Sequence, residues 1–426
     1  MVYVLSKTGQ PLMPTEDHRK VRLLIKNKLA VVEKRTPFTI RLTTKSKNYV
    51  QPTTLGVDAG SKTIGLSAST EQKELFAAEV TPRNDVVNNL STRREFRRGR
   101  RIRKPRYRKP RFNNRVHSKQ KGWLAPSVEV KIQEHITAIK RVCEILPVSK
   151  VVVETAEFDL QLLKAVADGK PVPAGEDYQK GEMYGHYNVR QYVLHRDGYA
   201  CQCCGAHGKD VKLHVHHRET KKIGGNAPDD LITLCETCHK KFHKGIITDS
   251  RFKKRGRQST RDAAFMGIMR KTLMERLRQE LNVPVVETKG YITKCTRETM
   301  LKLPKSHTND ALAIAQGRHG FGINKIILIP QVNKIYQIKP VRHHNRQLHK
   351  ATILKGDIRK SNQAPKYVKD FRLFDKALYN GQECFIWARR SSGYFMLKSL
   401  DGTKIKDGVS YKKLKLLERS SNYLIA

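Results

Sequence analysis

Apolar residues near the start of the chain alternate with polar ones over short stretches, which is the pattern of half-buried strands. Residues 2–6 and 30–42 have this period of two, and residues 18–30 between them have the spacing of a helix. Residues 55–69 form two further extended stretches around a glycine-rich turn, and residues 75–80 can add a third. Three consecutive strands with short connections predict an antiparallel meander.

The rest of the chain mixes helical and extended patterns. Apolar positions recur at helical spacing in residues 128–146 and 262–281, and residues 307–317 form an apolar run behind polar capping residues. The stretch "VVVE" reads as a buried strand that ends at Glu154, and residues 283–288 read as another strand. The C-terminal part predicts a small β-rich domain without a catalytic constellation.

The net charge of the chain indicates which class of partner it binds. Its 426 residues contain 84 Lys and Arg against 39 Asp and Glu, which gives a formal net charge of +45. Repulsion among so many positive charges destabilises a compact chain unless a polyanion neutralises them, so nucleic acid is the expected partner. A membrane surface fits less well, because the charge does not lie along an amphipathic helix with a bulky apolar face. At this length about two to four domains are expected.

The cysteines predict a metal site in a reducing compartment. Five of the eight cysteines and six of the sixteen histidines lie in residues 201–243. Two C-x-x-C pairs can close a tetrahedral zinc site, although a purely structural zinc ribbon would need nothing more, and Cys203 is left over. The candidate zinc ligands are Cys201, Cys204, Cys235 and Cys238. Because the cysteines cluster, and no signal peptide or membrane-spanning run is present, the cytosol is the expected compartment.

Four histidines beside the cysteines predict a second metal, because a zinc site closed by four cysteines needs none. His239 and His243 are four residues apart and share one helix face. His216 and His217 are neighbours on a strand, so they point to opposite faces, His216 towards the metal and His217 as a general base. The stretch resembles the ββα-metal domain of HNH endonucleases, in which one divalent ion stabilises charge developing at the phosphate. Asp230 stands where that family usually has Asn, and it either orients the base or binds the metal.

Three carboxylates lie at the ends of separate predicted elements. Asp58 ends a strand beside glycines that would let a phosphate backbone approach closely, and Glu154 ends another strand. Asp310 opens a helix, with His307 one turn earlier. Two strand-borne carboxylates and one helix-borne carboxylate in this order are the set with which a ribonuclease-H-like fold holds two magnesium ions about 4 Å apart. The carboxylates therefore predict a second nuclease site.

Residues 93–115 are strongly basic, with thirteen Arg and Lys and one acid. A helix that ends near Lys104, ahead of Pro105, would direct cations at three- and four-residue steps towards phosphates. A solvated charged segment is the alternative, but such segments are usually tails, and this run lies between two carboxylate segments. The candidate nucleic-acid contacts of the run are Arg93, Arg94, Arg97, Arg98, Arg100, Arg101, Arg103, Lys104 and Arg106.

The order of these motifs resembles the IscB family of transposon-encoded RNA-guided DNA endonucleases, which are relatives of the type II CRISPR effector nuclease. The resemblance covers nearly the whole chain, from "PLMP" through "GVDAG", the basic run, "VVVE" and the HNH block to "HTNDA". It implies an α+β multidomain fold with a ribonuclease-H-like RuvC core, split by an arginine-rich bridge helix and an inserted HNH domain. The implied RuvC site is Asp58, Glu154, His307 and Asp310, and the implied HNH site is His216, His217, His239 and His243. No long recognition lobe precedes Glu154, so a guide RNA would supply much of the scaffold.

The resemblance also implies a domain order and a β-rich end. The implied domains are residues 1–52 (N-terminal "PLMP" type), 53–90 (RuvC segment I), 91–120 (bridge helix), 121–160 (RuvC segment II), 161–255 (linkers and HNH), 256–325 (RuvC segment III) and 326–426 (C-terminal, interacting with a motif adjacent to the target). The C-terminal domain would read a short flanking DNA motif, with Arg342 and Arg346 as candidate contacts.

The implied function is RNA-guided cutting of double-stranded DNA. A long structured guide RNA would select the target, the HNH domain would cut the paired strand and RuvC the displaced strand. The implied cofactors are Mg²⁺ or Mn²⁺ at both nuclease sites, Zn²⁺ at the cysteines and the guide RNA itself, in a monomeric protein of a prokaryotic cytoplasmic ribonucleoprotein. Two alternatives remain, a guide-independent HNH homing endonuclease with a degenerate ribonuclease-H scaffold and a non-catalytic nucleic-acid-binding protein.

Overall fold

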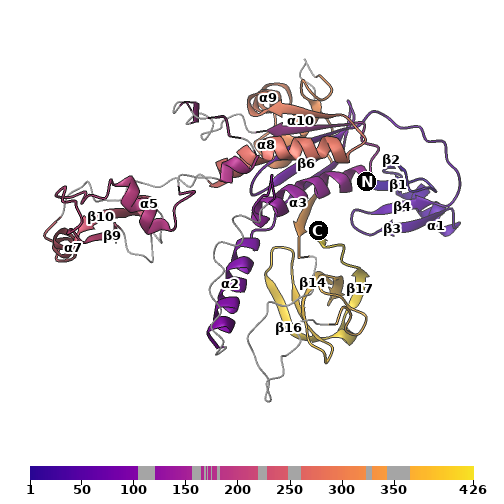
Figure 1. Ribbon diagram of the computed structural model, residues 1–426. Coiled ribbons are helices and arrows are strands. Elements are labelled where there is room, and N and C mark those ends of the chain that lie inside the picture. Colours follow the sequence, from indigo (N-terminus) through magenta and orange to yellow (C-terminus); the bar gives the residue numbers. More distant parts are fainter. Residues whose placement is uncertain are drawn as a thin grey trace. The chain divides into compact units, whose positions relative to one another are not determined.

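The chain divides into two compact units, and the second is inserted in the sequence of the first (Figure 1). Unit 1 comprises Met1–Asp159 and Phe265–Ala426, and unit 2 comprises Leu160–Ala264. The computed structural model describes residues 1–103, 120–155, 165–166, 169, 171–173, 175–179, 183–218, 228–247, 261–322, 329–342 and 365–426. No helix among these residues is long and apolar enough to cross a membrane.

Unit 1 begins with a four-stranded sheet and one helix. Their bounds are β1 Val2–Leu5, β2 Pro11–Thr15, α1 His18–Lys26, β3 Ala30–Lys34 and β4 Thr39–Leu42. The strand order is β2-β1-β4-β3, and β1 and β4 are parallel. Asp17 caps α1, because its carboxylate accepts a hydrogen bond from the backbone N–H of Lys20 at 2.8 Å.

A seven-stranded sheet forms the centre of unit 1. Its strands are β5 Thr54–Ala59, β6 Ile64–Ser69, β7 Glu74–Val80, β8 Lys150–Thr155, β11 Val285–Lys289, β12 Ile335–Pro340 and β18 Tyr423–Ile425. The order is β11-β8-β5-β6-β7-β12-β18. Strands β5, β6 and β7 pair antiparallel, which confirms the predicted meander. Strand β8 is parallel to β5, and β11 is parallel to β8.

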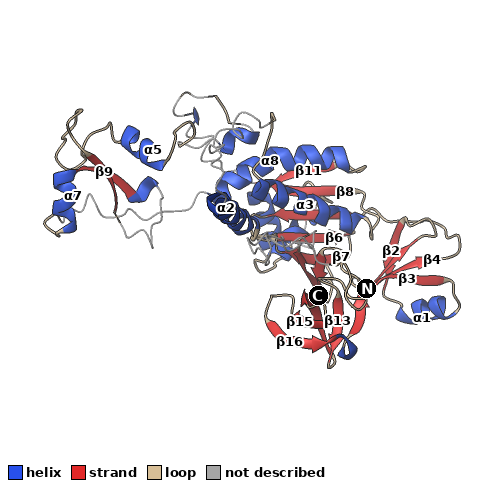
Figure 2. Cartoon of the chain, turned by 60° about the horizontal axis from the view of Figure 1, so that its bottom comes forward, coloured by secondary structure: helices blue, strands red, loops and turns tan. Residues whose placement is uncertain are grey.

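Helices accompany this sheet (Figure 2). They are α2 Val86–Arg103, α3 Pro126–Cys143, α8 Arg261–Glu280, α9 Gly290–Cys295, the π-helical turn Thr296–Met300 and α10 His307–Gln316. The predicted helices at 128–146, 262–281 and 307–317 are thus confirmed within a few residues. Ion pairs join α3 to α8, with Arg276 Nη1 2.6 Å from Glu129 Oε1 and Lys140 Nζ 2.5 Å from Glu280 Oε2.

Helix α10 lies directly on the sheet because two glycines leave room for its backbone. A Cβ atom at Gly56 of β5 would lie 2.0 Å from the carbonyl oxygen of Ala311, and one at Gly65 of β6 would lie 2.0 Å from that of His307. Both distances are shorter than any side chain tolerates. Gly56 and Gly65 therefore admit a helix of this chain, which corrects, at these two glycines, the expectation that they make room for a phosphate backbone.

A five-stranded antiparallel sheet follows near the C-terminus, as the predicted β-rich domain requires. Its strands are β13 Lys376–Tyr379, β14 Gln382–Arg389, β15 Tyr394–Lys398, β16 Lys404–Ser410 and β17 Lys415–Glu418. The order is β16-β15-β14-β13-β17, around a core that includes Ala377, Ile386 and Phe395. The last strand, β18, leaves this sheet and pairs antiparallel with β12 of the seven-stranded sheet.

Unit 2 is a small fold around one hairpin. Its described elements are the 3₁₀ turn Gly175–Gln179, α5 Val189–Arg196, β9 Leu213–His217, the 3₁₀ turn Pro228–Asp230, β10 Leu231–Cys235 and α7 Glu236–His243. Strands β9 and β10 are antiparallel, with His217 opposite Leu231 and Leu213 opposite Cys235. Ile232 and Leu234 are buried against the cysteines. The apolar core is small, so a metal ion is well placed to supply part of the folding free energy.

Candidate metal centres

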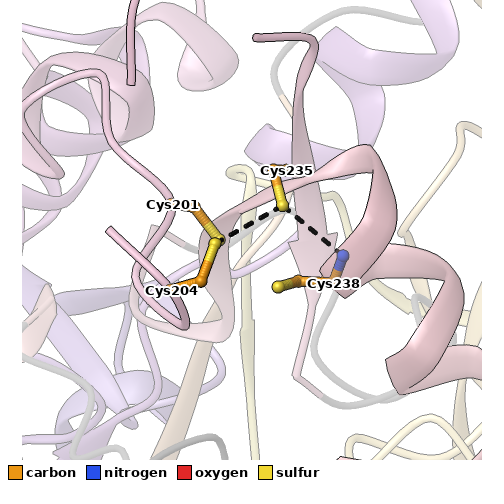
Figure 3. A group of neighbouring side chains, drawn as sticks. All are labelled: Cys201, Cys204, Cys235 and Cys238. Carbon is orange, nitrogen blue, oxygen red and sulfur yellow. Dashed lines mark hydrogen bonds between the residues drawn. The ribbon is translucent and has the colours of Figure 1, made fainter. Parts of the chain in front are cut away.

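Four cysteine side chains of unit 2 converge on one point (Figure 3). The Sγ atoms of Cys201, Cys204, Cys235 and Cys238 lie within 4.8 Å of one another. The Sγ atoms of Cys204 and Cys235 are 3.7 Å apart, close to the ~3.8 Å edge of a tetrahedron with Zn–S bonds of about 2.3 Å. The donor set and the spacing therefore fit a zinc ion. Cys203 is half-buried and does not belong to this group.

Backbone hydrogen bonds shape the two cysteine turns. Gly205 has a φ of +75°, which favours glycine, and its N–H donates to the carbonyl of Cys201 at 2.8 Å. Cys235 ends β10, and its Sγ accepts a hydrogen bond from the N–H of Cys238 at 3.5 Å, at the start of α7. Burial opposes ionisation of Cys201, but backbone N–H groups nearby lower the pKa of its thiol to about 7. This thiol is therefore prepared to act as a thiolate ligand.

Three histidines form a second group in unit 2. Ligand nitrogens of His216, His239 and His243 lie within 4.8 Å of one another. The Nε2 atoms of His239 and His243 are 3.3 Å apart, near the spacing of two ligands that share an ion at metal–nitrogen distances of about 2.1 Å. Burial and the neighbouring histidines lower the pKa of His216 to about 4. His216 is therefore neutral at pH 7, which is the form that binds a metal.

His217 and Asp230 lie next to this group without belonging to it. His217 is half-buried at the end of β9, and the alternation of the strand turns it away from the face of His216. Asp230 directly precedes Leu231, the residue that lies opposite His217 on β10, and it is 1% exposed. Its backbone carbonyl accepts a hydrogen bond from Arg218 N–H at 2.7 Å. Asp230 is absent from both ligand groups that the described residues form. Asp230 therefore lies beside the histidine group, and its charge acts on His216.

His214 is a neighbour of the histidine group that the motif reasoning did not single out. It lies two residues before His216 on β9, so the two side chains share a face of the strand. Its ring stacks on that of His239, with centroids 5.0 Å apart and an interplanar angle of 16°. The alternation of histidines in "HVHH" was the signal in the sequence that could have found it. His214 therefore packs against the ring of His239, one of the three candidate ligands.

Unit 1 brings together the three carboxylates at one edge of its central sheet. Asp58 and Glu154 are register partners on the parallel strands β5 and β8. Asp310 lies in the first turn of α10, and His307 at the start of that helix places Nδ1 2.6 Å from Asp58 Oδ2. Asp58 shares a face of β5 with Gly56, against which α10 packs. The two glycines thus set the distance between the helix-borne and the strand-borne groups.

The carboxylates influence one another electrostatically. Burial raises the pKa of Glu154, and the negative charges of Asp58 and Asp310 raise it further, against a hydrogen bond with Thr293. Burial likewise raises the pKa of Asp310, and Asp58 adds to this, whereas Arg297 opposes it. Repelling, partly buried carboxylates are a donor set that divalent cations neutralise, so the residues fit magnesium. They form no three-residue group within 4.8 Å among the described residues, so one ion would not contact all three as they stand.

Arg297 and Thr293 are parts of this edge that sequence reasoning missed. Arg297 lies in the π-helical turn after α9, and its Nε is 2.6 Å from Asp310 Oδ1. Thr293 is buried in α9. Gly290 begins that helix so close to Glu154 that an added Cβ would lie 3.2 Å from Oε1. Arg297 and Thr293 do not belong to a motif with recognisable spacing, so nothing in the sequence distinguished them from ordinary helix residues.

The basic run begins in a longer helix than the sequence predicted. Helix α2 starts at Val86, where the carbonyl of Asp85 accepts a hydrogen bond from Asn89 N–H at 2.9 Å, and it is described as far as Arg103, while its predicted end at Lys104 lies outside the described residues. Arg93 and Arg94 are exposed on it. The backbone of Arg97, Arg98, Arg100, Arg101 and Arg103 is helical, while their side chains, and the whole of Lys104, Arg106 and Arg346, lie outside the described residues. Arg342 is exposed just beyond β12.

Comparisons with known proteins identify two segments of the chain. Residues 201–245 match the family model of the HNH endonuclease, and residues 2–181 match that of the RRXRR protein. The chain thus contains a segment that is similar to HNH endonucleases. The chain is also 33% identical to Anaredoxin of Nostoc sp. (strain PCC 7120 / SAG 25.82 / UTEX 2576) over 65 residues. These are 15% of this chain and 83% of Anaredoxin, so over that region the two proteins belong to one family.

Two solved structures are also similar to the chain. One is Streptococcus thermophilus Cas9 in complex with the GGAA PAM, with a TM-score of 0.31 and 15% identity over 56% of this chain. The other is the same protein with the AGAA PAM, with a TM-score of 0.31 and 14% identity over 54% of this chain. The aligned regions span 31% and 30% of those Cas9 chains, so this chain covers less than a third of their length.

Proposed function

We propose that the chain is an RNA-guided double-stranded DNA endonuclease of the IscB kind. The histidine site of unit 2 would cut the strand that pairs with the guide, and the carboxylate site of unit 1 would cut the displaced strand. The observation that carries the proposal is that one chain brings together two separate groups of side chains that are suited to bind divalent cations. One is formed by His216, His239 and His243, and the other is assembled from three distant segments through Asp58, Glu154 and Asp310.

The topology of the central sheet supports a ribonuclease-H-like core. An antiparallel meander of β5, β6 and β7 continues into the parallel strands β8 and β11 on the β5 side. The carboxyl ends of β5 and β8 meet at one edge of the sheet, where ligands of open mixed sheets commonly bind. The insertion of unit 2 between β8 and α8 separates the second and third carboxylate segments. This is the split arrangement that the proposed family requires.

Divalent ions would supply charge stabilisation and a water of lowered pKa at both sites. In unit 2, His216, His239 and His243 would hold the ion, and His217 on the other face would take a proton from the attacking water. In unit 1, Asp58, Glu154 and Asp310 would offer oxygen ligands. His307 is held by Asp58, and that hydrogen bond raises its pKa, so a protonated His307 can hold a phosphate oxygen or give up a proton.

Cleavage with and without RNA tests the proposal against its two rivals. The protein is expected to cut a supercoiled plasmid in both strands only with a guide RNA whose sequence matches the plasmid. Equal cutting without RNA would establish a guide-independent endonuclease, and binding without any cutting in Mg²⁺ or Mn²⁺ would establish a non-catalytic binding protein. Sequencing of the RNA that co-purifies with the protein identifies the guide.

Asp230→Asn is expected to leave unit 2 folded and the histidine site active. The amide has the same shape as the carboxylate and can still orient the base, whereas Asp230→Ala would leave buried partners unsatisfied at a cost of about 1–3 kcal/mol. The rate of target-strand cleavage and the zinc content of both variants check this. Loss of cleavage in the Asn variant with zinc retained would show that the carboxylate of Asp230 is itself a metal ligand.

Arg97, Arg100 and Arg101 are expected to carry part of the affinity for RNA. Replacing all three with Gln should reduce the slope of log affinity against log salt by roughly two to three, because each lost phosphate contact removes about 0.7–0.9. Fluorescence anisotropy of labelled guide RNA between 50 and 200 mM salt measures the slope. The matched control replaces Arg19, Arg22 and Lys26, which are three exposed basic residues on α1. An unchanged slope in the first variant would remove the bridge-helix interpretation.

A further inference from the structure

We propose that Arg297 is a positioning residue of the carboxylate site, whose fixed positive charge holds Asp310 in place as a ligand for a cation. Nothing in the sequence motifs or the matched families assigns this residue. The inference rests on the proposed function, because it takes the carboxylates of Asp58, Glu154 and Asp310 to bind divalent ions.

The geometry gives Arg297 one partner oxygen on Asp310. Its Nε lies 2.6 Å from Oδ1, and its Nη2 lies 2.9 Å from Glu298 Oε1. The Nε–H bond does not point at an acceptor, so the contact with Asp310 is an ion pair and not an aligned hydrogen bond. Among the described residues, no hydrogen bond or ion pair engages Oδ2 of Asp310, so this oxygen is available to a cation.

The surrounding backbone fixes where the guanidinium lies. Arg297 belongs to the π-helical turn Thr296–Met300, a geometry that often occurs at functional sites. Its carbonyl accepts a hydrogen bond from Leu303 N–H at 3.0 Å, and that of Thr296 accepts one from Leu301 N–H at 2.9 Å. The side chain of Arg297 is only 6% exposed. A long cationic side chain is therefore held in a single buried position facing α10.

The charge balance of the edge explains why a guanidinium is suited to this place. Three carboxylates lie near one another, and mutual repulsion favours their neutral forms. His307 offers Asp58 a positive charge only when it is protonated, whereas an arginine stays charged at every relevant pH. Arg297 thus places a fixed positive charge beside one of the three carboxylates. Lys305, whose charge also acts on Glu154 and Asp310, is exposed and more strongly screened.

Two other roles would leave the same ion pair in the structure. The pair could serve only to anchor α10, or the guanidinium could compete with a cation for Asp310. These roles differ in their effect on metal binding. A positioning charge strengthens it, an anchor leaves it unchanged, and a competitor weakens it.

Binding of Mn²⁺ to the full chain at pH 7.5, followed by electron paramagnetic resonance, separates these roles. All variants carry His239→Ala, so that the signal reports the carboxylates. Arg297→Gln is expected to weaken Mn²⁺ binding by about tenfold or more, because losing the partner that orients a metal ligand typically costs roughly 10–100-fold in metal affinity. Arg297→Lys keeps the charge and should restore most of the binding.

The controls make each outcome decisive. Arg276→Gln breaks the equally short ion pair with Glu129 between α8 and α3, and it should leave the affinity for Mn²⁺ unchanged. Asp58→Asn should weaken Mn²⁺ binding, and if it does not, the proposed carboxylate site itself is wrong. If Asp58→Asn weakens binding while Arg297→Gln leaves it unchanged or tightens it, only the inference about Arg297 fails. Should the Gln variant unfold in a thermal melt, the Lys variant decides, because a weakened affinity despite the retained charge overturns the proposal.

Discussion

Asp58→Ala is expected to abolish cutting of the displaced strand while the guide-paired strand is still cut. Asp58 supplies one of the carboxylates and holds Nδ1 of His307 at 2.6 Å, so the change removes a ligand and releases the histidine together. Loss of the charge stabilisation that a metal provides is worth several kcal/mol, which corresponds to a decrease in rate of roughly a thousandfold or more. End-labelling each strand of a guide-matched duplex separately measures the two rates.

His217→Ala is the converse test, and Glu71→Gln is the matched control for Asp58→Ala. The histidine variant should lose cutting of the paired strand and keep cutting of the displaced one. Glu71 lies exposed in the turn between β6 and β7 of the same sheet as Asp58, so its loss changes a surface charge without touching the carboxylate edge. Loss of both cuts from either site variant would contradict the assignment of one strand to each unit.

Cys235→Ser is expected to remove zinc and unfold unit 2. Cys235 contributes a ligand, accepts the hydrogen bond that starts α7, and lies in the small core beside Ile232 and Leu234. Structural zinc in small domains contributes apparent binding free energies of about 10–16 kcal/mol, and losing one of four thiolates forfeits much of this. Elemental analysis of zinc per chain and limited proteolysis of residues 160–264 measure the two effects.

Cys203→Ser is the control for this prediction, because Cys203 lies in the turn between Cys201 and Cys204 but outside the four-cysteine group. It should keep one zinc per chain and the proteolytic resistance of unit 2. The ligand assignment is wrong if Cys235→Ser retains full zinc, or if Cys203→Ser loses it. Since unit 1 contains none of these cysteines, its own thermal transition should persist in both variants.

The chemistry of unit 2 was largely predictable because its ligands are local. The two C-x-x-C pairs each lie within one turn, and His239 and His243 are one helical turn apart, so sequence spacing fixes which side chains meet within each pair. The face of His216 followed from strand alternation in the same way. The stacking of His214 on His239 was missed, because it depends on how α7 crosses the β9–β10 hairpin.

The carboxylate site of unit 1 was less predictable from the sequence, because its residues come from distant segments. The sequence placed Asp58 and Glu154 at strand ends and Asp310 at a helix start, and the order of the three indicated a shared site. Whether they meet depends on pairing β5 with β8 in one register, and on the depth at which α10 lies on the sheet. A strand displaced by one residue would turn a carboxylate to the other face.

The sequence by itself determined the kind of chemistry: a basic chain with cysteine and histidine ligands at metal-binding spacing and carboxylates at the ends of apolar segments. Those features depend on residue type and on neighbours within one or two turns, so they survive without knowledge of the fold. Only the tertiary structure decided that Gly56 and Gly65 make room for α10, and that Arg297 from a π-helical turn faces Asp310. Both results come from packing between segments far apart in sequence, where the close approach of backbones and the compensation of a buried charge, and not local pattern, select the residue.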